Sequence, residues 1–207
     1  MGRIVVSEFV SLDGVMEDPG GAEATRHGGW TFRFERGPEG DRFKLDEVLT
    51  AEALLLGRVT YQGFAAVWPS MEDPVGFAEK MNAMPKFVVS STLADADATW
   101  QNSTVVRGDP AVEVTRLREE HAGDLLVAGS AALVQLLIEH GLVDELRLMV
   151  FPVVLGSGKR LFGEVSHVAS FSLGEVQTIG GGVAVLTYHP LSKADDQHDA
   201  SPANPTR

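Results

Sequence analysis

Two spacings of apolar positions alternate along the chain. Short apolar or β-branched runs, typical of strands, occur at residues 3–9, 53–56, 86–90, 103–106, 124–128, 143–154, 168–176 and 183–188. Apolar positions three and four residues apart predict helices at residues 38–50, 60–66, 74–82 and 130–140 and a further helix from residue 110. This alternation, with a hairpin around residues 180–182, predicts an α/β fold with a mainly parallel sheet and an antiparallel C-terminal hairpin.

The pattern predicts one folded domain, residues 1–191, and a tail. Residues 192–207 read SKADDQHDASPANPTR, and they contain too few apolar side chains to offset the entropy of ordering. We therefore expect a flexible polar tail. The chain shows neither a targeting segment nor an apolar run long enough for a membrane span, so the expected location is cytoplasmic.

Composition and charge narrow the function classes. The 207 residues include no cysteine, which excludes disulfides, thiolate metal sites and thiol nucleophiles. The six histidines show no metal-ligand spacing, so no metal site is predicted. The net charge of −12 disfavours nucleic acid and membrane surfaces as partners. A small anionic ligand would need locally concentrated positive charge.

Three predicted strand ends carry glycine, hydroxyl or arginine side chains. In open α/β sheets, ligands bind beyond the carboxyl ends of the strands, where helix N-termini favour phosphate. Taken singly, each turn is equally typical of ordinary strand–helix connections. Together they indicate a cofactor that bears phosphate, and the residues concerned are Gly57, Arg58, Thr60, Ser90, Ser91, Thr92, Gly129, Ser130, Ala131, Ala132 and Leu133.

Five segments occur in an order that resembles one known family. They are SLDG (11–14), LLLGRVTY (54–61), VVSSTL (88–93), VAGSAALVQLLIEHGLVDEL (127–146) and FPVVLGSGKRLF (151–162). Over about residues 1–190 the chain resembles the dihydrofolate-reductase-like family, and in particular the reductase domain of the bifunctional riboflavin-biosynthesis deaminase/reductase. The resemblance implies a three-layer sandwich that binds NADPH and a heterocyclic substrate, and it implies a homodimer.

The same resemblance assigns parts of the cofactor to residues. Gly57, Arg58 and Thr60 match the turn at the adenosine phosphate, and the stretch from Gly129 to Leu133 matches the helix start that binds the pyrophosphate. Ser90, Ser91 and Thr92 match the strand end near the 2′-phosphate, where Arg107 would add positive charge. For Arg107, a solvated strand-end charge is the alternative interpretation.

Fewer residues are candidates for catalysis or substrate binding than for cofactor binding. Asp41 lies sixteen residues before Gly57, a spacing that resembles the position of the acid in dihydrofolate reductases. Asp13 of the SLDG segment is expected to orient the nicotinamide or the substrate, and a tight Asp-Gly turn is the alternative. Five aromatic side chains could either stack on a planar substrate or pack in the core: Trp30, Tyr61, Phe64, Trp68 and Phe151.

The predicted function is an NADPH-dependent reductase that acts on a small nitrogen heterocycle. The first substrate hypothesis is 5-amino-6-(5-phosphoribosylamino)uracil, whose ribose is reduced to ribityl in riboflavin biosynthesis. Dihydrofolate or another pterin is the alternative substrate. A non-catalytic NADP-binding protein is the alternative from another class.

Overall fold

The computed structural model describes residues 1–191, which contain one eight-stranded sheet. The predicted tail lies outside the described residues. The strands follow the order β4-β3-β2-β5-β1-β6-β8-β7 across the sheet. Their bounds are β1 (Arg3–Ser11), β2 (Ala51–Gly57), β3 (Lys86–Val89), β4 (Ser103–Val106), β5 (Asp124–Val127), β6 (Glu145–Phe151), β7 (Phe171–Ile179) and β8 (Val183–Pro190).

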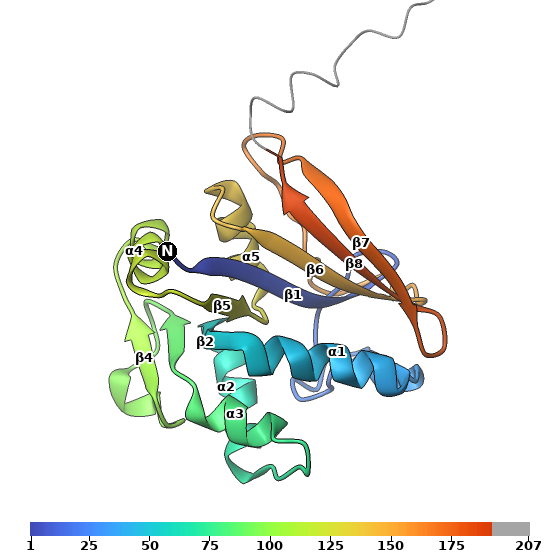
Figure 1. The fold of residues 1–207 in the computed structure, drawn as a ribbon, viewed down its shortest axis with the longest axis horizontal. Helices are drawn as coiled ribbons and strands as arrows, with labels where there is room; N and C mark the ends of the chain where they lie inside the picture. Colours follow the sequence, from blue (N-terminus) through green and yellow to red (C-terminus); the bar gives the residue numbers. More distant parts are fainter. Residues whose placement is uncertain (192–207) are drawn as a thin grey trace, which may run out of the picture.

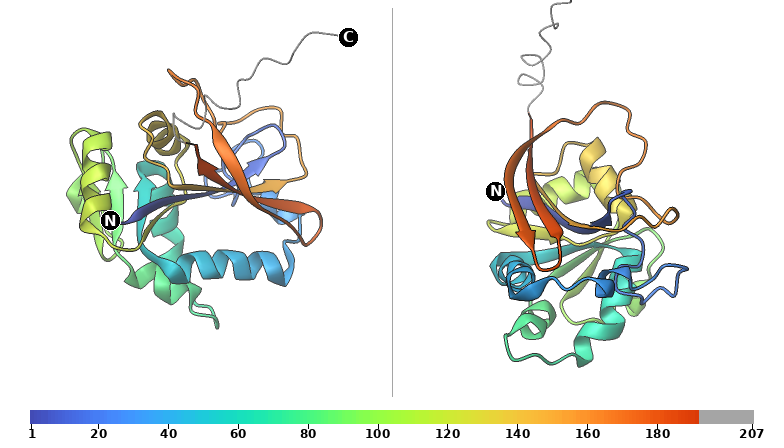
Figure 2. Two further views of the ribbon diagram at one scale, coloured as in Figure 1. Left: turned by 45° about the horizontal axis from the view of Figure 1, so that its top comes forward. Right: turned by 90° about the vertical axis from the view of Figure 1, so that its right-hand side faces the viewer.

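Five α-helices in the described residues cover the two faces of the sheet (Figures 1 and 2). They are α1 (Gly37–Thr50), α2 (Arg58–Val67), α3 (Phe77–Ala83), α4 (Pro110–Glu120) and α5 (Ala131–Glu139). Short 3-10 helices span Trp30–Arg33, Trp68–Ser70 and Asp95–Asp97. The first three α-helices share one apolar core with the sheet, and α4 and α5 share another. The predicted three-layer sandwich is therefore confirmed.

Burial on both faces explains the nearly continuous apolar character of the central strands. Leu54 and Leu56 of β2 point toward α1–α3, whereas Leu55 points toward α4 and α5, and all three are fully buried. The five central pairings, from β4 across to β6, are parallel. Parallel strands covered on both faces need apolar residues at every position rather than at alternate ones.

The C-terminal strands complete the sheet as predicted, with shifted bounds. The pairings β6–β8 and β7–β8 are antiparallel. The predicted strand over 143–154 is shorter in the structure, because Pro152 follows Phe151 and has no N–H to donate to a neighbouring strand. The strand predicted from residue 168 begins instead at Phe171. Within residues 1–191, no helix is both long enough and apolar enough to cross a membrane.

Candidate cofactor and substrate site

The carboxyl ends of β2 and β5 form the crevice where a ligand is expected. These strands are neighbours, but β2 leads into α2 on one face of the sheet and β5 leads into α5 on the other. In open α/β sheets, ligands bind where adjacent connections leave in opposite directions.

Glycines allow the two turns at this crevice to touch. The Gly57 amide donates to the Gly129 carbonyl at 3.2 Å. A Cβ on Gly57 would overlap the Ser130 hydroxyl, and a Cβ on Gly129, whose φ is +95°, would lie 2.6 Å from Thr60 Oγ1. The peptide bond between Gly129 and Ser130 is cis. The structure thus brings together four of the predicted cofactor residues: Gly57, Thr60, Gly129 and Ser130.

Both helices at the crevice begin without a side-chain cap. Gly57 precedes α2 and Ser130 precedes α5, and neither forms a capping hydrogen bond from its side chain. Neither first turn contains an acidic residue. In the first turn of α5, Ala131 is partly buried and Ala132 is exposed, while Leu133 packs into the core. Uncapped amides and the helix dipoles favour an anion, so this crevice suits the diphosphate of a dinucleotide.

Three adjacent strand ends extend the crevice toward the edge of the sheet. The register pairs Gly57 with Val89 and Val89 with Val106, so Arg58, Ser90 and Arg107 each follow a strand at the same level. These backbone positions put two arginines and the hydroxyl-bearing turn after β3 along one edge of the sheet.

These side chains also have partners within the protein. The Ser90 hydroxyl accepts hydrogen bonds from the amides of Thr92 and Leu93, at 3.2 and 3.0 Å, and so closes the turn. Ser91 and Thr92 are exposed. Arg107 donates to the Leu93 carbonyl and to Asp95, and Arg58 donates to Gln62 at 2.9 Å. A phosphate would compete with Asp95 for Arg107.

A cavity of about 650 Å³ opens beside the C-terminal end of β1. Asp41 lies in its wall, with a side chain that is 69% exposed and paired with Arg36 at 2.9 Å. The structure therefore puts Asp41 at a cavity but leaves its carboxylate accessible to water. Its role as the acid stays a prediction. The cavity lining comprises Phe9, Gly20, Thr31, Phe32, Phe34, Glu35, Arg36, Gly37, Pro38 and Asp41.

Asp18 shapes the loop that forms one side of this cavity. Its buried carboxylate accepts hydrogen bonds at 3.0 Å from the Glu23 amide and from both the amide and the hydroxyl of Thr25. The indole of Trp30 donates to the Glu17 carbonyl at 2.9 Å. These bonds give the loop a defined path from β1 to α1.

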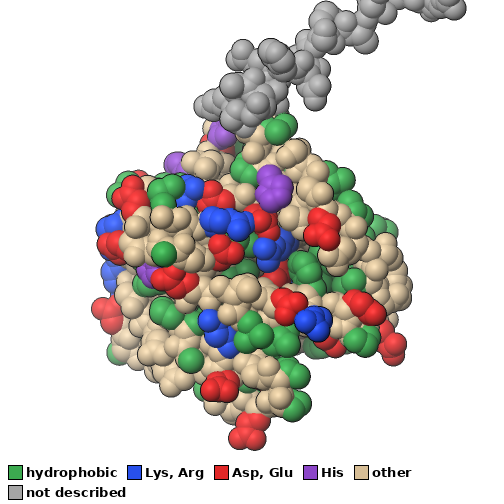
Figure 3. All heavy atoms as spheres, in the orientation of Figure 1, with side chains coloured by type: hydrophobic (Ala, Val, Ile, Leu, Met, Phe, Trp, Pro, Cys, Tyr) green, Lys and Arg blue, Asp and Glu red, His purple; other side chains and the backbone are tan. Residues whose placement is uncertain are grey.

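A charged network lies beneath the cavity, on the α1 face of β1. Buried Glu47 accepts hydrogen bonds from the Ser7 hydroxyl at 3.0 Å and from Arg147 at 3.2 Å, and it pairs with Lys44 at 2.6 Å. The Lys44 ammonium also lies 5.2 Å from the ring centre of Phe9, which lines the cavity. In Figure 3, basic and acidic side chains gather near the middle of this face.

Glu8 is the most perturbed acid in the described residues. It is only 6% exposed, and its Oε1 atom has no hydrogen-bond partner. Burial raises the pKa of Glu8 from its ordinary value to about 8, an effect that Lys44 and the Gly129 amide oppose. A carboxyl group of this kind is largely protonated at neutral pH.

Asp13 has the opposite environment. Its carboxylate accepts hydrogen bonds from the Ser11 hydroxyl at 2.7 Å and from the amides of Leu155 and Gly156 at 3.1 and 2.9 Å. These bonds, with Ser11 the strongest influence, lower the pKa of Asp13 to about 2. In the structure Asp13 joins the SLDG turn to the loop after β6. Its role toward a ligand stays a prediction.

The aromatic candidates fall into two groups, both packed within the protein. Trp30 and Phe151 are fully buried and meet edge to face, with ring centres 5.3 Å apart. Tyr61 is buried, and its hydroxyl accepts a hydrogen bond from the Trp100 amide. Phe64 and Trp68 pack against each other, partly buried over α2 and α3. These are core roles, and substrate contact by any of the five stays a prediction.

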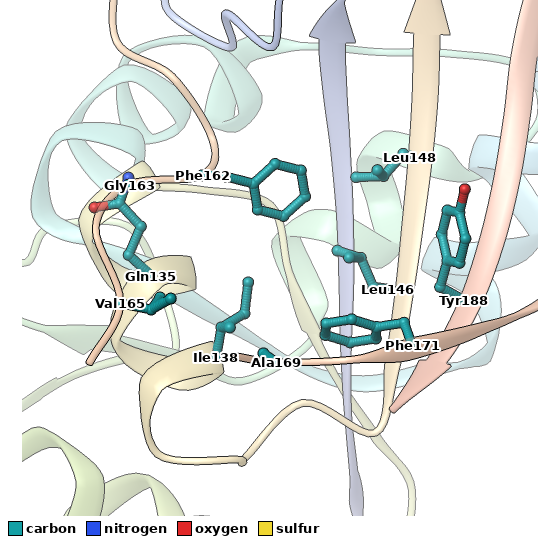
Figure 4. A pocket seen from close by; sticks show the side chains of 10 residues that line it. All are labelled: Gln135, Ile138, Leu146, Leu148, Phe162, Gly163, Val165, Ala169, Phe171 and Tyr188. Atoms are coloured by element: carbon teal, nitrogen blue, oxygen red, sulfur yellow. The ribbon is translucent and has the colours of Figure 1, made fainter. Parts of the chain in front are cut away.

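A second cavity, of about 330 Å³, lies on the α5 face, away from the strand ends. Side chains from α5, β6, β8 and residues 162–171 point into it, and nearly all are apolar (Figure 4). At its rim, Phe162 and Val165 are 50% and 43% exposed. Its lining contains no charged group, so it is a poor site for a dinucleotide. The homodimer stays a prediction.

Sequence reasoning missed Glu8 and the network around Glu47. The available signal for Glu8 was a lone acid inside an otherwise apolar strand, since Val6 and Val10 on either side of it belong to the core. Lys44 and Glu47 looked like ordinary helix-surface charges, because their burial depends on Arg147, a hundred residues after Glu47. Within residues 1–191, no group of three or more His, Asp or Glu side chains could hold a metal ion.

Strand order, helix placement and crevice together define an α/β protein of the dihydrofolate-reductase-like fold. More specifically, residues 3–185 match the model of the RibD C-terminal domain, and the chain belongs to that family.

Curated relatives of the chain are found in Bacillus subtilis strain 168. The uncharacterised protein YyaP is 29% identical over 192 residues, which cover 90% of this chain and 94% of YyaP. The uncharacterised protein YwjB is 29% identical over 181 residues, covering 87% of this chain and 94% of YwjB.

Solved structures share the fold at lower sequence identity. A putative riboflavin biosynthesis protein from Shewanella sp. PV-4 superposes with a TM-score of 0.74 at 21% identity, covering 92% of this chain and 99% of its own. Dihydrofolate reductase from Enterococcus faecalis, complexed with NADP(H) and RAB-propyl, superposes with a TM-score of 0.55 at 16% identity. The match covers 92% of this chain and 97% of that reductase. A pyrimidine reductase-like protein from Corynebacterium diphtheriae superposes with a TM-score of 0.59 at 11% identity, and the match covers 92% of each chain.

Proposed function

We propose that this protein is an NADPH-dependent reductase of a small nitrogen heterocycle, with 5-amino-6-(5-phosphoribosylamino)uracil as the first candidate substrate. Membership of the RibD C-terminal domain family supports an oxidoreductase of riboflavin biosynthesis. The observation that carries the proposal is the meeting of two uncapped helix N-termini at Gly57 and Gly129.

In this proposal the cofactor lies across the strand ends. The first amides of α2 and α5 bind the diphosphate, and Arg58 and Arg107 bind the 2′-phosphate that distinguishes NADPH from NADH. A bound dihydronicotinamide would supply a hydride to the substrate. NADP(H) in the E. faecalis dihydrofolate reductase supports a nicotinamide cofactor in this fold.

The substrate occupies the cavity of about 650 Å³ beside β1. Phe9, Phe32 and Phe34 supply apolar surface for a planar ring, and Arg36 supplies positive charge at the rim. The Lys44–Glu47–Arg147 network holds the wall behind Phe9 in place. A phosphorylated pyrimidine suits this combination of aromatic and basic groups.

The test follows NADPH consumption with 5-amino-6-(5-phosphoribosylamino)uracil and, separately, with dihydrofolate. We expect the loss of NADPH absorbance with the pyrimidine and formation of its ribityl product. Turnover of dihydrofolate alone would favour a pterin reductase. Binding of NADPH without consumption in the presence of either compound would contradict the proposed activity and favour a non-catalytic NADP-binding protein.

A further inference from the structure

The segment that leads into α1 lines the larger cavity and carries its basic group. Among the described residues that line this cavity, Arg36 is the only basic one, and Glu35 and Asp41 are the acidic ones. The guanidinium carbon of Arg36 lies 5.5 Å from the centre of the Phe9 ring, which also lines the cavity. The positive charge of Arg36 is therefore held beside the aromatic surface that is proposed to receive the substrate ring.

The partner of Arg36 is an exposed carboxylate on the same helix. Arg36 Nη2 and Asp41 Oδ1 are 2.9 Å apart, and the Asp41 side chain is 69% exposed. An ion pair in contact with water contributes little net stability, so another anion can replace the carboxylate. Lys44, the second cation beside the Phe9 ring, pairs instead with buried Glu47. Of these two cations, Arg36 is the one whose partner a ligand can exchange.

The turn between β7 and β8 fixes the backbone that carries Arg36. The Gly181 amide donates to the Glu35 carbonyl at 2.9 Å. A Cβ on Gly180 would overlap that carbonyl oxygen, and a Cβ on Gly37 would lie 3.4 Å from the Cα of Gly180. In Figures 1 and 2 this turn lies beside the start of α1. The C-terminal hairpin, remote in sequence, thus sets the position of the Arg36 backbone at the cavity.

We propose that Arg36 determines specificity at this cavity by binding a phosphate group of the substrate, and that Asp41 is the internal anion that this phosphate replaces. The inference rests on the proposed function and narrows its substrate class to planar heterocycles that carry a phosphate. A guanidinium presents paired N–H donors that match two phosphate oxygens, and such charge-assisted bonds are strong. The β7–β8 turn has a positioning role, because it acts on the substrate only through Arg36.

The test compares uridine 5′-monophosphate with uridine, each titrated by calorimetry into the protein saturated with NADPH. The two probes share a pyrimidine ring and a ribose and differ only in the phosphate. Saturation with NADPH keeps both probes out of the proposed cofactor crevice. We expect the monophosphate to bind the wild type at least about tenfold more tightly than uridine. Inorganic phosphate should compete with the monophosphate and not with uridine.

Substitution of Arg36 tests its role directly. Arg36→Gln removes the positive charge, so we expect the monophosphate to bind no more tightly than uridine, whose affinity should not change. Arg36→Lys keeps the charge without the paired donors and should bind the monophosphate with intermediate affinity. The matched control is Arg42→Gln, because Arg42 lies on the same helix and pairs with Asp46 at 3.5 Å but does not line the cavity. This control should keep the wild-type preference.

Asp41→Asn tests the exchange of anions. The variant removes the carboxylate that competes with the phosphate, so we expect the monophosphate to bind about threefold more tightly and uridine to bind as before. Asp46→Asn, at the equivalent ion pair outside the cavity, is the control and should change neither affinity. A role of Asp41 as an acid alone would leave the affinity for the monophosphate unchanged, and that result would overturn the exchange.

Two glycines of the same turn test the positioning role. Gly180→Ala, at φ +47°, displaces the Glu35 carbonyl, whereas Gly182→Ala, at φ +97°, meets no atom within 4 Å. Backbone strain should destabilise both variants, but only Gly180→Ala should lose the preference for the monophosphate. With 5-amino-6-(5-phosphoribosylamino)uracil, Gly180→Ala should raise KM and leave kcat nearly unchanged. An equal preference in the two variants would overturn the positioning role.

The outcomes separate the role of Arg36 from the proposed function. Equal affinity of the wild type for the two probes, or a preference that persists in Arg36→Gln, would overturn the role of Arg36 and leave cofactor binding and reductase activity intact. Should Arg36→Gln not fold, Arg36→Lys and the competition by inorganic phosphate in the wild type give the same decision. Failure of the wild type to bind NADPH would instead overturn the proposed function, and this inference with it.

Discussion

Single carboxyl groups in this protein behave differently because their surroundings differ. Glu8 lies in an apolar interior that disfavours charge, whereas Asp13 accepts three hydrogen bonds that favour it. Both residues are close to the end of β1, yet their pKa values are shifted in opposite directions. Such separation is how neighbouring carboxyl groups acquire different tasks.

Asp13→Asn tests the structural role of Asp13. A carboxylate whose folded-state pKa is lowered stabilises the fold above its unfolded pKa of about 3.9, and that stabilisation is lost as the pH falls toward the folded value of about 2. We therefore expect Asp13→Asn to lower the melting temperature at neutral pH. The difference from the wild type should shrink as the pH falls from about 4 to about 2. Equal melting temperatures at neutral pH would contradict this role.

At the residue scale, the sequence of a turn predicted those residues whose position depends on that turn alone. Gly57, Thr60, Gly129 and Ser130 were predicted from turn composition, and the structure brings them into one crevice. Glu8 could not be predicted in the same way, because its burial depends on β5 and α5, more than a hundred residues away in the chain.

At the scale of elements, the proposed function depends on the contact between the β2–α2 and β5–α5 turns, where the dinucleotide is proposed to bind. Gly129→Ala introduces a Cβ at φ +95° and 2.6 Å from Thr60 Oγ1. The matched control is Gly141→Ala, where φ is +62° and the Cβ meets no atom within 4 Å. We expect both variants to lose about 1–3 kcal/mol of unfolding free energy through backbone strain, measured by chemical denaturation.

Only Gly129→Ala should also weaken NADPH binding, by at least about tenfold, because only there do the helix N-termini move apart. Calorimetric titration of both variants provides the comparison. Equal NADPH affinity in Gly129→Ala and Gly141→Ala would contradict the assignment of this crevice to the diphosphate.

Element bounds were predicted best where one residue ends an element. Pro38, in the first turn, marks the start of α1, and Gly141 follows the end of α5. Bounds in the C-terminal strands were less accurate, since the apolar runs there continue into loops. Val153 and Val154, for example, extend the apolar pattern of β6 but lie beyond its last hydrogen-bonded pair.

At the scale of the whole molecule, the net charge of −12 and an anionic ligand are compatible. Arg58 follows β2 and Arg107 follows β4, on either side of β3, so two positive charges lie along the same edge of the sheet. The fold class was predictable because strand–helix alternation constrains topology strongly. The path of the loop around Asp18 was not predictable from the sequence, because it depends on specific side-chain hydrogen bonds.

The measurement that tests the central claim most directly is calorimetric titration of the wild-type protein with NADPH and with NADH. Arg58→Ala is titrated in parallel, with Arg116→Ala on the surface of α4 as its control. The account predicts micromolar or tighter binding of NADPH, NADH binding at least about tenfold weaker, and loss of that preference in Arg58→Ala alone. Absence of binding by either nucleotide below millimolar concentration would contradict it.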